Sequence, residues 1–484
     1  MVLLSAGKPA FPRVVAFTPT RGVSTLNTKP KTPQRVRSSS TSVLSEIKAS
    51  ESASGKAPLP PLAALPTSVL LRSLLVATIS SKPYLLLPSL KALSFFCKPR
   101  KGALFNVDRN PILHGILKAT FYKQFCAGET PDEVRRTIQQ LNGMGFQGTI
   151  MTYAKETVFD HKTQTSVGLG IEKENPDAEG GVLFCQQIEA WRKGTIDTID
   201  TLGENDYLAL KLTGAGPTVT DAFSTGSLPP QQMLSALDEI SSKCKARGVR
   251  ILVDAESHHY LAGILRVTLD LMRKFNKDGH ARIYNTYQGY LKSTPDTIAA
   301  HLAAASEEGF TLGLKLVRGA YIASDERSLI HDTKAETDNA YNGIAQGTLR
   351  RELGEFGTSR PFPSVNLFLA SHNKESVMAA HALHQQRVRE GLPTVPVGFG
   401  QLHGMSDEVS FSLLQLKGQG QGQGHPEDGD PKVYKCSTWG GLGECLAYLL
   451  RRAIENRDAV SRTGDEYNAL KREAARRFRA LFGG

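Results

Sequence analysis

A short stretch near the C-terminus, residues 448–457, contains residue types that could bind a small anion. It has strong helix formers and neither glycine nor proline, which favours a helix. On a helical period Tyr448, Arg451, Arg452 and Glu455 fall on one face. Two guanidinium groups beside an aromatic ring and a carboxylate would pair with a carboxylate ligand through bidentate hydrogen bonds. Taken alone, this pattern is more often a solvated charged face, so the surrounding elements must decide.

Polar residues that could do further chemistry follow six short β-rich runs. They are Lys211; Asp254 and Glu256; Tyr287 and Gln288; Arg318 and Tyr321; Ser371, His372 and Asn373; and Gln401 and His403. Singly, each has a structural explanation. Asp254 could cap the next helix, His372 could be a hydrogen-bonded loop histidine, and Lys211 could be exposed. Together, at equivalent positions, they predict a mouth lined with hydrogen-bonding groups.

The runs that precede these residues belong to an alternation of short strands with longer helices. Eight strands are predicted, at residues 146–152, 207–212, 249–253, 281–286, 311–317, 365–370, 396–400 and 432–436. Helices are predicted at 130–143, 182–192, 230–246, 259–275, 296–308 and 326–353, the fifth capped by Thr294 and Pro295. Such alternation predicts parallel strands joined by right-handed crossovers. The predicted α/β fold is a closed (β/α)8 barrel, with chemistry at the C-terminal strand ends; an open doubly wound sheet is the alternative.

The net charge of +11 belongs to the N-terminal part of the 484-residue chain. Up to Lys101 there are fifteen lysines and arginines but only two acidic residues, Glu46 and Glu51. The remainder is near neutral, which argues against a nucleic-acid-binding surface. The six cysteines form no Cys-x-x-Cys pair, so they indicate buried thiols of a reducing compartment, not a zinc site or a disulfide framework.

Residues 1–46 have the composition of a mitochondrial transit peptide. No acidic residue precedes Glu46, and lysines and arginines are spread through a Ser/Thr-rich background. We therefore expect a disordered presequence. A disordered basic tail without a targeting role is the alternative.

Residues 47–103 are predicted to form a linker and an N-terminal helical arm. Residues 68–96 are apolar but interrupted by Arg72, Lys82 and two prolines, so no uncharged run reaches the ~18 residues of a membrane span. This stretch could be a helix pair packed on the body, or an interfacial membrane anchor. Residues 104–484 are predicted to form the barrel domain. A Gln/Gly-rich insertion at 418–430 within it is expected to be disordered.

Several common kinds of site lack support in the sequence. There is no complete G-x-G-x-x-G loop, no phosphate-binding P-loop and no G-x-S-x-G nucleophile elbow. His258 and His259 are adjacent and would diverge instead of chelating one ion, so no metal is expected.

Six motifs follow one another along the chain: VDAE (253–256), NTYQ (285–288), KLVRGAY (315–321), ASHN (370–373), QLHGM (401–405) and YLLRRAIEN (448–456). Together they resemble the proline dehydrogenase family of mitochondrial flavoenzymes, from about Leu104 to Asp458. The resemblance implies a distorted TIM-type barrel that binds FAD at its C-terminal face and oxidises L-proline to 1-pyrroline-5-carboxylate, the first step of proline catabolism. Electrons would pass to a membrane quinone, which implies association with the matrix face of the inner mitochondrial membrane.

The resemblance also implies roles for single residues. Lys211, Arg451 and Arg452 would bind the proline carboxylate. Glu455 would position that cluster, and Tyr448 would line the proline ring. Two residues would be catalytic: Asp254 is similar to the family's active-site aspartate, and Lys315 stands where bacterial members carry an arginine near the flavin N5. The residues implied to contact FAD are Ala255, Gln288, Arg318, Gly319, Ala320, Ser371, His372 and Leu402.

One position departs from the family's pattern. Many members have a tyrosine after the lysine of the eighth strand, where this chain has Cys436. The smaller side chain would loosen the pocket around a ring substituent unless Tyr434 or Trp439 fills the space, so hydroxyproline is an alternative substrate. The sequence also leaves open a methylenetetrahydrofolate reductase-like flavin enzyme and a catalytically silent, membrane-tethered interaction protein.

Overall fold

The computed structural model describes residues 59–97, 104–153, 156–160, 165–169, 184–418, 429–458 and 460–482. The predicted transit peptide, residues 1–46, lies outside these ranges. So does most of the predicted Gln/Gly-rich insertion, residues 419–428. Both expectations therefore stay predictions.

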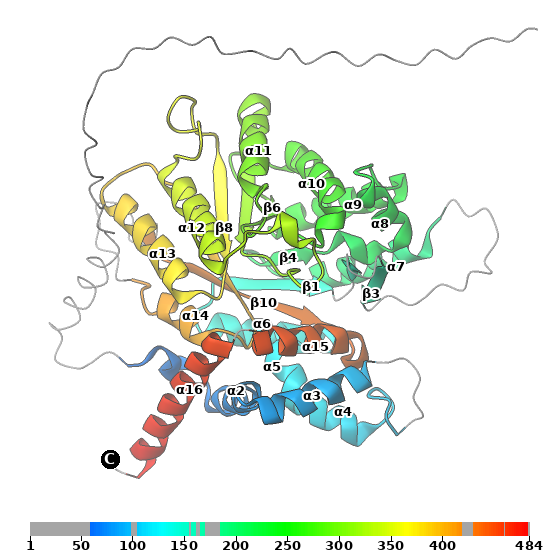
Figure 1. Ribbon diagram of the computed structural model, residues 1–484, viewed down its shortest axis with the longest axis vertical. Coiled ribbons are helices and arrows are strands. Elements are labelled where there is room, and N and C mark those ends of the chain that lie inside the picture. The colour runs from blue at the N-terminus through cyan, green and yellow to red at the C-terminus, as the bar shows by residue number, and fades with distance from the viewer. Residues whose placement is uncertain are drawn as a thin grey trace, which may run out of the picture. The chain divides into compact units, whose positions relative to one another are not determined.

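Eight parallel strands close into a barrel in the order β1-β10-β9-β8-β7-β6-β5-β4. Figure 1 labels five of them, β1, β4, β6, β8 and β10. Their bounds are β1 Gly148–Tyr153, β4 Tyr207–Leu210, β5 Arg250–Val253, β6 Ile283–Gln288, β7 Leu312–Val317, β8 Val365–Ala370, β9 Val397–Leu402 and β10 Lys432–Trp439. Each predicted strand run corresponds to one of them. The closed barrel confirms the predicted fold and excludes the open sheet.

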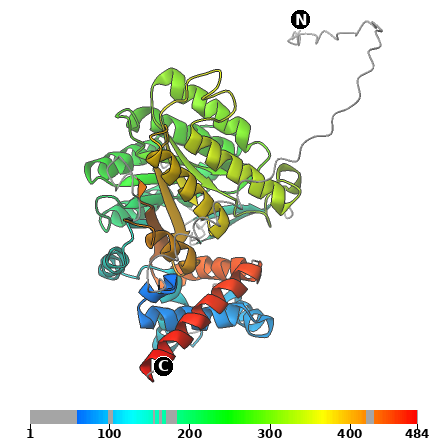
Figure 2. The same ribbon diagram turned by 90° about the vertical axis from the view of Figure 1, so that its left-hand side faces the viewer.

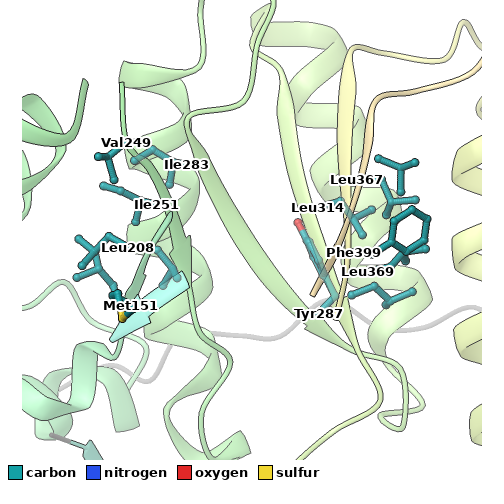
Figure 3. Packing of buried hydrophobic residues seen from close by; sticks show 14 of the residues in the cluster. Met151, Leu208, Val249, Ile251, Ile283, Tyr287, Leu314, Leu367, Leu369 and Phe399 are labelled. Carbon is teal, nitrogen blue, oxygen red and sulfur yellow. The ribbon is translucent and has the colours of Figure 1, made fainter. Parts of the chain in front are cut away.

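Helices follow the strands and cover the outside of the barrel. Those after β1 are α7 Gln186–Ile199, α8 Pro217–Ser224, α9 Gln231–Ala246, α10 Leu261–Phe275, α11 Thr294–Glu308, α12 Lys334–Arg350, α13 Lys374–Arg389, α14 Asp407–Leu414, α15 Leu442–Asp458 and α16 Val460–Leu481. Outward-facing strand residues such as Leu208, Leu314 and Phe399 form one buried cluster with helix residues such as Leu237 and Ile264. Figure 3 labels the three strand residues. Removing this apolar surface from water is the main force that holds the helices on the sheet.

Inside the barrel, four aromatic side chains form a floor. Tyr207, Tyr284, Phe368 and Tyr434 come from alternate strands, β4, β6, β8 and β10, as expected for one layer of a (β/α)8 interior. Their rings meet edge to face, for example Tyr207 and Tyr434 with centroids 5.0 Å apart. The intervening strands make room with glycine: a Cβ on Gly400 would lie 2.7 Å from the ring of Phe368.

A helical arm precedes the barrel and lies at the same end of the molecule as α15 and α16 (Figures 1 and 2). It consists of α2 Thr67–Ser80, α3 Pro83–Phe96, α4 Pro111–Leu117, the π-helical turn η3 Lys118–Tyr122, α5 Lys123–Phe125 and α6 Pro131–Gly143. The predicted helix pair is thus α2 and α3, bent by 98°. Leu86, Leu90 and Leu93 of α3 pack on Ala453 of α15.

Three local expectations were wrong or incomplete. The N-cap of α11 is Ser293, and the Thr294 hydroxyl donates to the carbonyl of Gln288 instead of capping the helix. The helix predicted from residue 326 begins at Lys334, because Thr333 and Glu336 form a capping box there. A hairpin, β2 Glu156–Asp160 and β3 Thr165–Leu169, was not predicted; it lies between β1 and α7.

Candidate functional site

The C-terminal strand ends bring together three charged residues that are far apart in the sequence. Lys211 directly follows β4, Asp254 directly follows β5, and Lys315 lies within β7. The Lys315 ammonium donates to Asp254 Oδ1 at 2.6 Å, and Lys211 Nζ lies 3.2 Å from Asp254 Oδ2. All three side chains are largely buried, with 11, 17 and 14% exposure for Lys315, Asp254 and Lys211. Asp254 therefore bridges two cations and does not cap a helix.

The electrostatics of this cluster favour an anion. Burial alone would raise the pKa of Asp254, but the ammonium groups of Lys315 and Lys211 lower that pKa to about 2. At neutral pH the carboxylate is ionised between two lysines, which leaves one net positive charge. A single carboxylate ligand would neutralise it.

Cys436 of β10 belongs to the same site. It packs at the edge of the aromatic cluster and stays half-buried. Burial raises the pKa of its thiol to about 11; the charge of Asp254 also raises it, against Lys315, Lys211 and Arg452. The thiol is therefore neutral at physiological pH, and it offers a small, weakly polar surface beside the charged cluster.

The helix α15 contributes the arginines predicted from the C-terminal motif. Arg452 is buried, and its guanidinium lies over the ring of Tyr448, 4.9 Å from the centroid. The positive charge of Arg452 lowers the pKa of the Cys436 thiol. Arg451 is half-buried. Glu455 belongs to α15, but its side chain is outside the described part of the chain.

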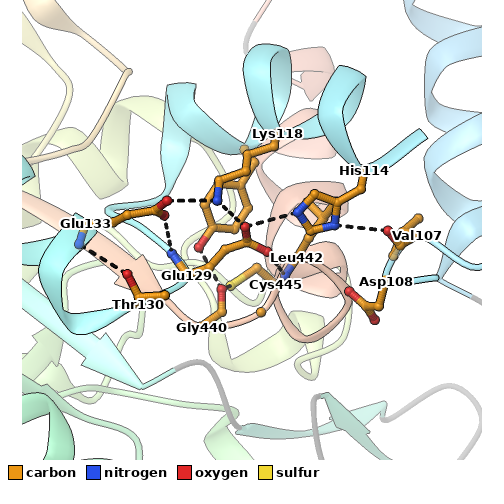
Figure 4. Close-up of polar contacts among 12 residues, drawn as sticks. Val107, Asp108, His114, Lys118, Glu129, Thr130, Glu133, Gly440, Leu442 and Cys445 are labelled. Atoms are coloured by element: carbon orange, nitrogen blue, oxygen red, sulfur yellow. Dashed lines mark hydrogen bonds and ion pairs between the residues drawn. The ribbon is translucent and has the colours of Figure 1, made fainter. Parts of the chain in front are cut away.

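The start of α15 is held by acidic side chains, two of them from outside the helix; Figure 4 shows one of these, Glu129, with its hydrogen bond to Leu442. The backbone N–H groups of Leu442 and Gly443 donate to Glu129 and Asp108. Carboxylates satisfy the otherwise unpaired N–H groups of a helix start and favour its dipole. Glu129 in turn forms an ion pair with Lys118 and contacts His114 at 3.1 Å. The arm therefore sets the position of the helix that carries the arginines.

Arg318 is held rigidly just after β7. Its Nε donates to Asp338 at 2.8 Å, and its two terminal nitrogens donate to the hydroxyls of Ser371 and Ser376 at 2.6 and 2.8 Å. The guanidinium also lies 4.3 Å from the ring centroid of Tyr341. Such a fixed fork suits a phosphate group. Two predicted contact residues, Arg318 and Ser371, are thus joined directly.

The next residue, Gly319, needs to be glycine. Its φ is +136°, and a Cβ there would lie 2.4 Å from the ring of Tyr290. Tyr290 itself donates to the buried Asp325 at 2.7 Å. The loop that contains Arg318, Gly319 and Ala320 is therefore pressed against a fixed ring.

The remaining predicted contact residues also line the strand ends. The Leu402 N–H donates to His372 Nε2 at 3.2 Å, so a neutral His372 ring would carry its proton on Nδ1. The Gln288 amide donates to the carbonyl of Glu256 at 3.3 Å. Ala255 lies between Asp254 and Glu256 at the mouth.

These residues fit a flavin nucleotide. Ala209, Ala370 and Cys436 form a layer of small side chains directly above the aromatic floor, and above it the rim turns cationic and hydrogen-bonding. A flat, largely apolar ring system suits the small layer, and the Arg318 fork suits a pyrophosphate. A metal is less suited: no group of three potential ligands occurs in the described ranges.

A separate pocket of about 360 Å³ lies between α7 and the start of α15. Tyr153, Asp197, Trp439 and Glu444 line it, together with Glu129. None of the predicted site residues does, and we place the chemistry at the barrel mouth because the charged groups converge there.

Sequence reasoning missed three supports of the site. Trp191 donates from its indole to the Lys211 carbonyl at 3.0 Å, and Thr213 donates to Glu256 from both its backbone and its hydroxyl. The network around Glu129 was also missed. Glu256 was visible in the VDAE motif, but nothing in the sequence pointed to its partner.

A buried cluster with net positive charge at the mouth of a closed (β/α)8 barrel is typical of barrel enzymes, whose active sites lie at this end. Comparison with known proteins agrees. The family profile described as proline dehydrogenase matches residues 134–465, more than half of the chain, so the chain belongs to the proline dehydrogenase family.

Individual relatives carry two different names. The chain is 28% identical to the probable mitochondrial proline dehydrogenase of Schizosaccharomyces pombe, covering 84% of this chain and 87% of that protein. It is 31% identical to hydroxyproline dehydrogenase of Bos taurus, covering 75 and 82%. Human mitochondrial proline dehydrogenase 1 is 32% identical, covering 62 and 51%.

Solved structures share the fold. Proline utilization A from Bdellovibrio bacteriovorus, inactivated by N-propargylglycine, superposes with a TM-score of 0.57 at 15% identity. The match covers 86% of this chain and 40% of that one, so this chain spans about two fifths of that protein.

Proposed function

We propose that this protein oxidises L-proline to 1-pyrroline-5-carboxylate with bound FAD and passes the electrons to a membrane quinone. One observation carries the proposal: Lys211, Asp254 and Lys315 form a net cationic cluster at the mouth. Family membership supplies the reaction class. The reaction would be the first step of proline catabolism.

The substrate carboxylate would lie between Lys211 and the pair Arg451 and Arg452. Charge-assisted hydrogen bonds from three cations would fix its orientation. Tyr448, which already stacks on Arg452, would pack against the proline ring. Glu455, one helical turn after Arg451, would position the guanidinium groups.

FAD would be held by Ala255, Gln288, Arg318, Gly319, Ala320, Ser371, His372 and Leu402. When bound, it supplies the acceptor for the hydride from the proline carbon next to nitrogen. Lys315 would place a positive charge beside that ring system, where negative charge develops on reduction. Arg318 would face the pyrophosphate.

Asp254 would act by holding charge in place and not by exchanging a proton. A carboxyl with a pKa of about 2 is a poor general acid or base near neutral pH. Its contacts instead fix the ammonium groups of Lys211 and Lys315 toward the mouth. Water excluded from this largely buried cluster would strengthen its interaction with substrate.

The test is the visible spectrum of the purified full-length protein under anaerobic conditions. Flavin absorbance bands that bleach on addition of L-proline are expected. A folded protein without flavin bands would contradict the proposed flavin-dependent reaction and favour a catalytically silent interaction protein. Flavin bands that persist after L-proline is added would show that L-proline is not the substrate.

Hydroxyproline is the second candidate substrate. Cys436 is small, half-buried and adjacent to the cluster, so it leaves more room for a ring hydroxyl than a tyrosine would. The relatives named hydroxyproline dehydrogenase are as similar as those named proline dehydrogenase. Bleaching by trans-4-hydroxy-L-proline but not by L-proline would make it the substrate.

We also propose that the arm attaches the protein to the matrix face of the inner mitochondrial membrane. Many of its apolar side chains are exposed: Leu71, Leu75, Tyr84, Leu85, Leu87, Phe95, Leu104, Phe105, Ile112 and Ile116. The sequence from 59 to 107 contains six basic and no acidic residues. Apolar side chains flanked by positive charge suit an anionic lipid surface.

The lengths of the described helices limit how the arm would meet a bilayer. No single one is long and apolar enough to span it, although α2 and α3 pass that test as a bent pair. Co-flotation with phosphatidylcholine vesicles is expected only when phosphatidylglycerol is included. Tyr84→Ser with Leu87→Ser should weaken it, and Leu392→Ser, an exposed leucine on another part of the surface, should not. Unchanged flotation of the double variant would contradict the proposal.

The mitochondrial location rests on the basic N-terminal composition and on relatives whose names include it. A fluorescent fusion to residues 1–46 is expected to enter mitochondria. Cytosolic fluorescence would contradict a targeting role.

A further inference from the structure

Lys211 has a long side chain that needs a fixed base if its ammonium is to meet a substrate accurately. Its contact with Asp254, at 3.2 Å, is longer than the 2.6 Å contact of Lys315. Lys315 projects from the middle of the barrel wall. Lys211 instead lies at the point where β4 ends and the short turn η4, Leu212–Ala215, begins. The shape of that turn therefore decides where the Lys211 side chain starts.

The turn is held by a buried carboxylate. The Thr213 N–H donates to Glu256 Oε1 at 3.1 Å, and the Thr213 hydroxyl donates to Glu256 Oε2. Glu256 is only 1% exposed. A buried polar group is costly without hydrogen-bond partners, and both oxygens of the Glu256 carboxyl group have one here. The pair thus fixes one backbone geometry for η4.

The segment Asp254–Glu256 consequently restrains Lys211 at both its ammonium group and the turn that follows it. Asp254 holds the ammonium, and Glu256 holds the turn that follows the Lys211 backbone. The Trp191 indole N–H donates to the Lys211 carbonyl at 3.0 Å. The Glu256 carbonyl also accepts from Gln288, so the same segment joins the lysine to the proposed flavin contacts.

We propose that Thr213 and Glu256 are positioning residues that set the reach of the Lys211 ammonium toward the substrate carboxylate. The inference rests on the proposed function, which assigns that carboxylate to Lys211. A loosened turn would spread the ammonium over several positions and weaken binding of the carboxylate. The geometry of hydride transfer from proline to the flavin would be little changed, because Lys315 lies on another strand and does not depend on this turn.

The test is a double-mutant cycle between Thr213→Val and Lys211→Ala. Thr213→Val removes the hydroxyl but keeps the side-chain volume. It is expected to raise KM for proline about tenfold with kcat changed less than about twofold, since it removes ground-state binding. In the Lys211→Ala background the same change should have no further effect on KM. Thr213→Ser, which keeps the hydroxyl, should restore KM.

Thr220→Val is the matched control, because Thr220 is a buried threonine of α8 whose hydroxyl donates to the Pro217 carbonyl. It should leave KM unchanged. Affinity for cyclopentanecarboxylate, a proline-shaped anion without nitrogen, provides a second readout. The inhibition constant of this anion, measured in competition with proline, should rise about tenfold in Thr213→Val. Glu256→Gln serves if Thr213→Val does not fold.

The outcomes separate two failures. Additive effects on KM in the cycle would overturn the positioning role, even though Lys211 still binds substrate. An unchanged KM in Lys211→Ala alone would overturn the proposed role of Lys211 itself. A fall in kcat without a change in KM or anion affinity would show that Thr213 and Glu256 act on another step.

Discussion

The floor and the mouth of the barrel are built on the same strands but follow different rules. At the floor, Tyr207, Tyr284, Phe368 and Tyr434 fill the interior with rings. Two residues further along the corresponding strands, Ala209, Ala370 and Cys436 replace aromatics with small side chains. Beyond them the rim is charged. The floor is filled by buried rings, and the mouth keeps ionised groups close together.

The difference shows how one fold separates its two tasks. Burying rings near native packing density stabilises the barrel without any demand on charge. Holding Lys211 and Lys315 on one carboxylate carries a desolvation cost that only good geometry offsets. Changes at the floor should therefore alter stability, and changes at the mouth should alter activity.

The largest expected effect is at the floor. Phe368→Ala should lower the free energy of unfolding by about 3–5 kcal/mol, because it leaves a cavity among three tyrosines. Urea unfolding followed by circular dichroism measures this. The KM for proline should stay near that of the original protein in the fraction that remains folded. A raised KM with unchanged stability would reverse the assignment of the two regions.

Asp254→Asn should have the next largest effect, at the mouth. Without the carboxylate, two buried ammonium groups repel each other and lose their common anchor. We expect kcat/KM to fall on the order of 100-fold or more in steady-state assays. Asp278→Asn, which removes an exposed carboxylate, is the control. Equal activity of the Asp254→Asn and Asp278→Asn variants would show that Asp254 has no role in the active site.

The pH dependence of stability should depend on Asp254. Its folded pKa, about 2, lies below its ordinary value of 3.8. The carboxylate therefore contributes stability above about pH 4, and this contribution is lost as pH falls toward 2. Its size, from the pKa difference, is about 2 kcal/mol. The stability gap between the original protein and Asp254→Asn should narrow over that range. A constant gap would mean that Asp254 is not paired.

Cys436→Tyr should have the smallest effect and should concern selectivity. The larger ring would occupy space beside the charged cluster, so kcat/KM for hydroxyproline should fall relative to that for proline by about tenfold. Cys244→Ser, a buried cysteine of α9, tests whether loss of any thiol has the same effect. An unchanged ratio would indicate that Cys436 does not contact the substrate ring.

Most of the fold was predictable because local signals repeat. Thr130 with Glu133 marks the start of α6, and the structure shows that cap. Each strand was a short apolar run before polar residues. The hairpin β2–β3 was missed because its strands carry no comparable apolar run and lie inside a long connection. The start of α12 was misplaced because the capping box at Thr333 was overlooked.

The site was predictable as a set of residues but not as an arrangement. Polar strand ends pointed to Lys211 and Asp254, the family resemblance to Lys315, and the helical pattern at 448–457 to Arg452. These residues are spread along the sequence from Lys211 to Arg452, and no periodic pattern relates them. Thr213 and Glu256 could not be paired in advance, because many threonines and glutamates would have been equally suitable.

The sequence by itself determined the alternation of strands and helices, the polar strand ends and the basic N-terminal part. These follow from periodicity and composition, which act over a few residues. Only the tertiary structure decided that one carboxylate, Asp254, bridges two lysines and that the arm fastens the start of α15. Barrel closure sets the distances around Asp254, since it brings strand ends from distant parts of the chain within hydrogen-bonding range.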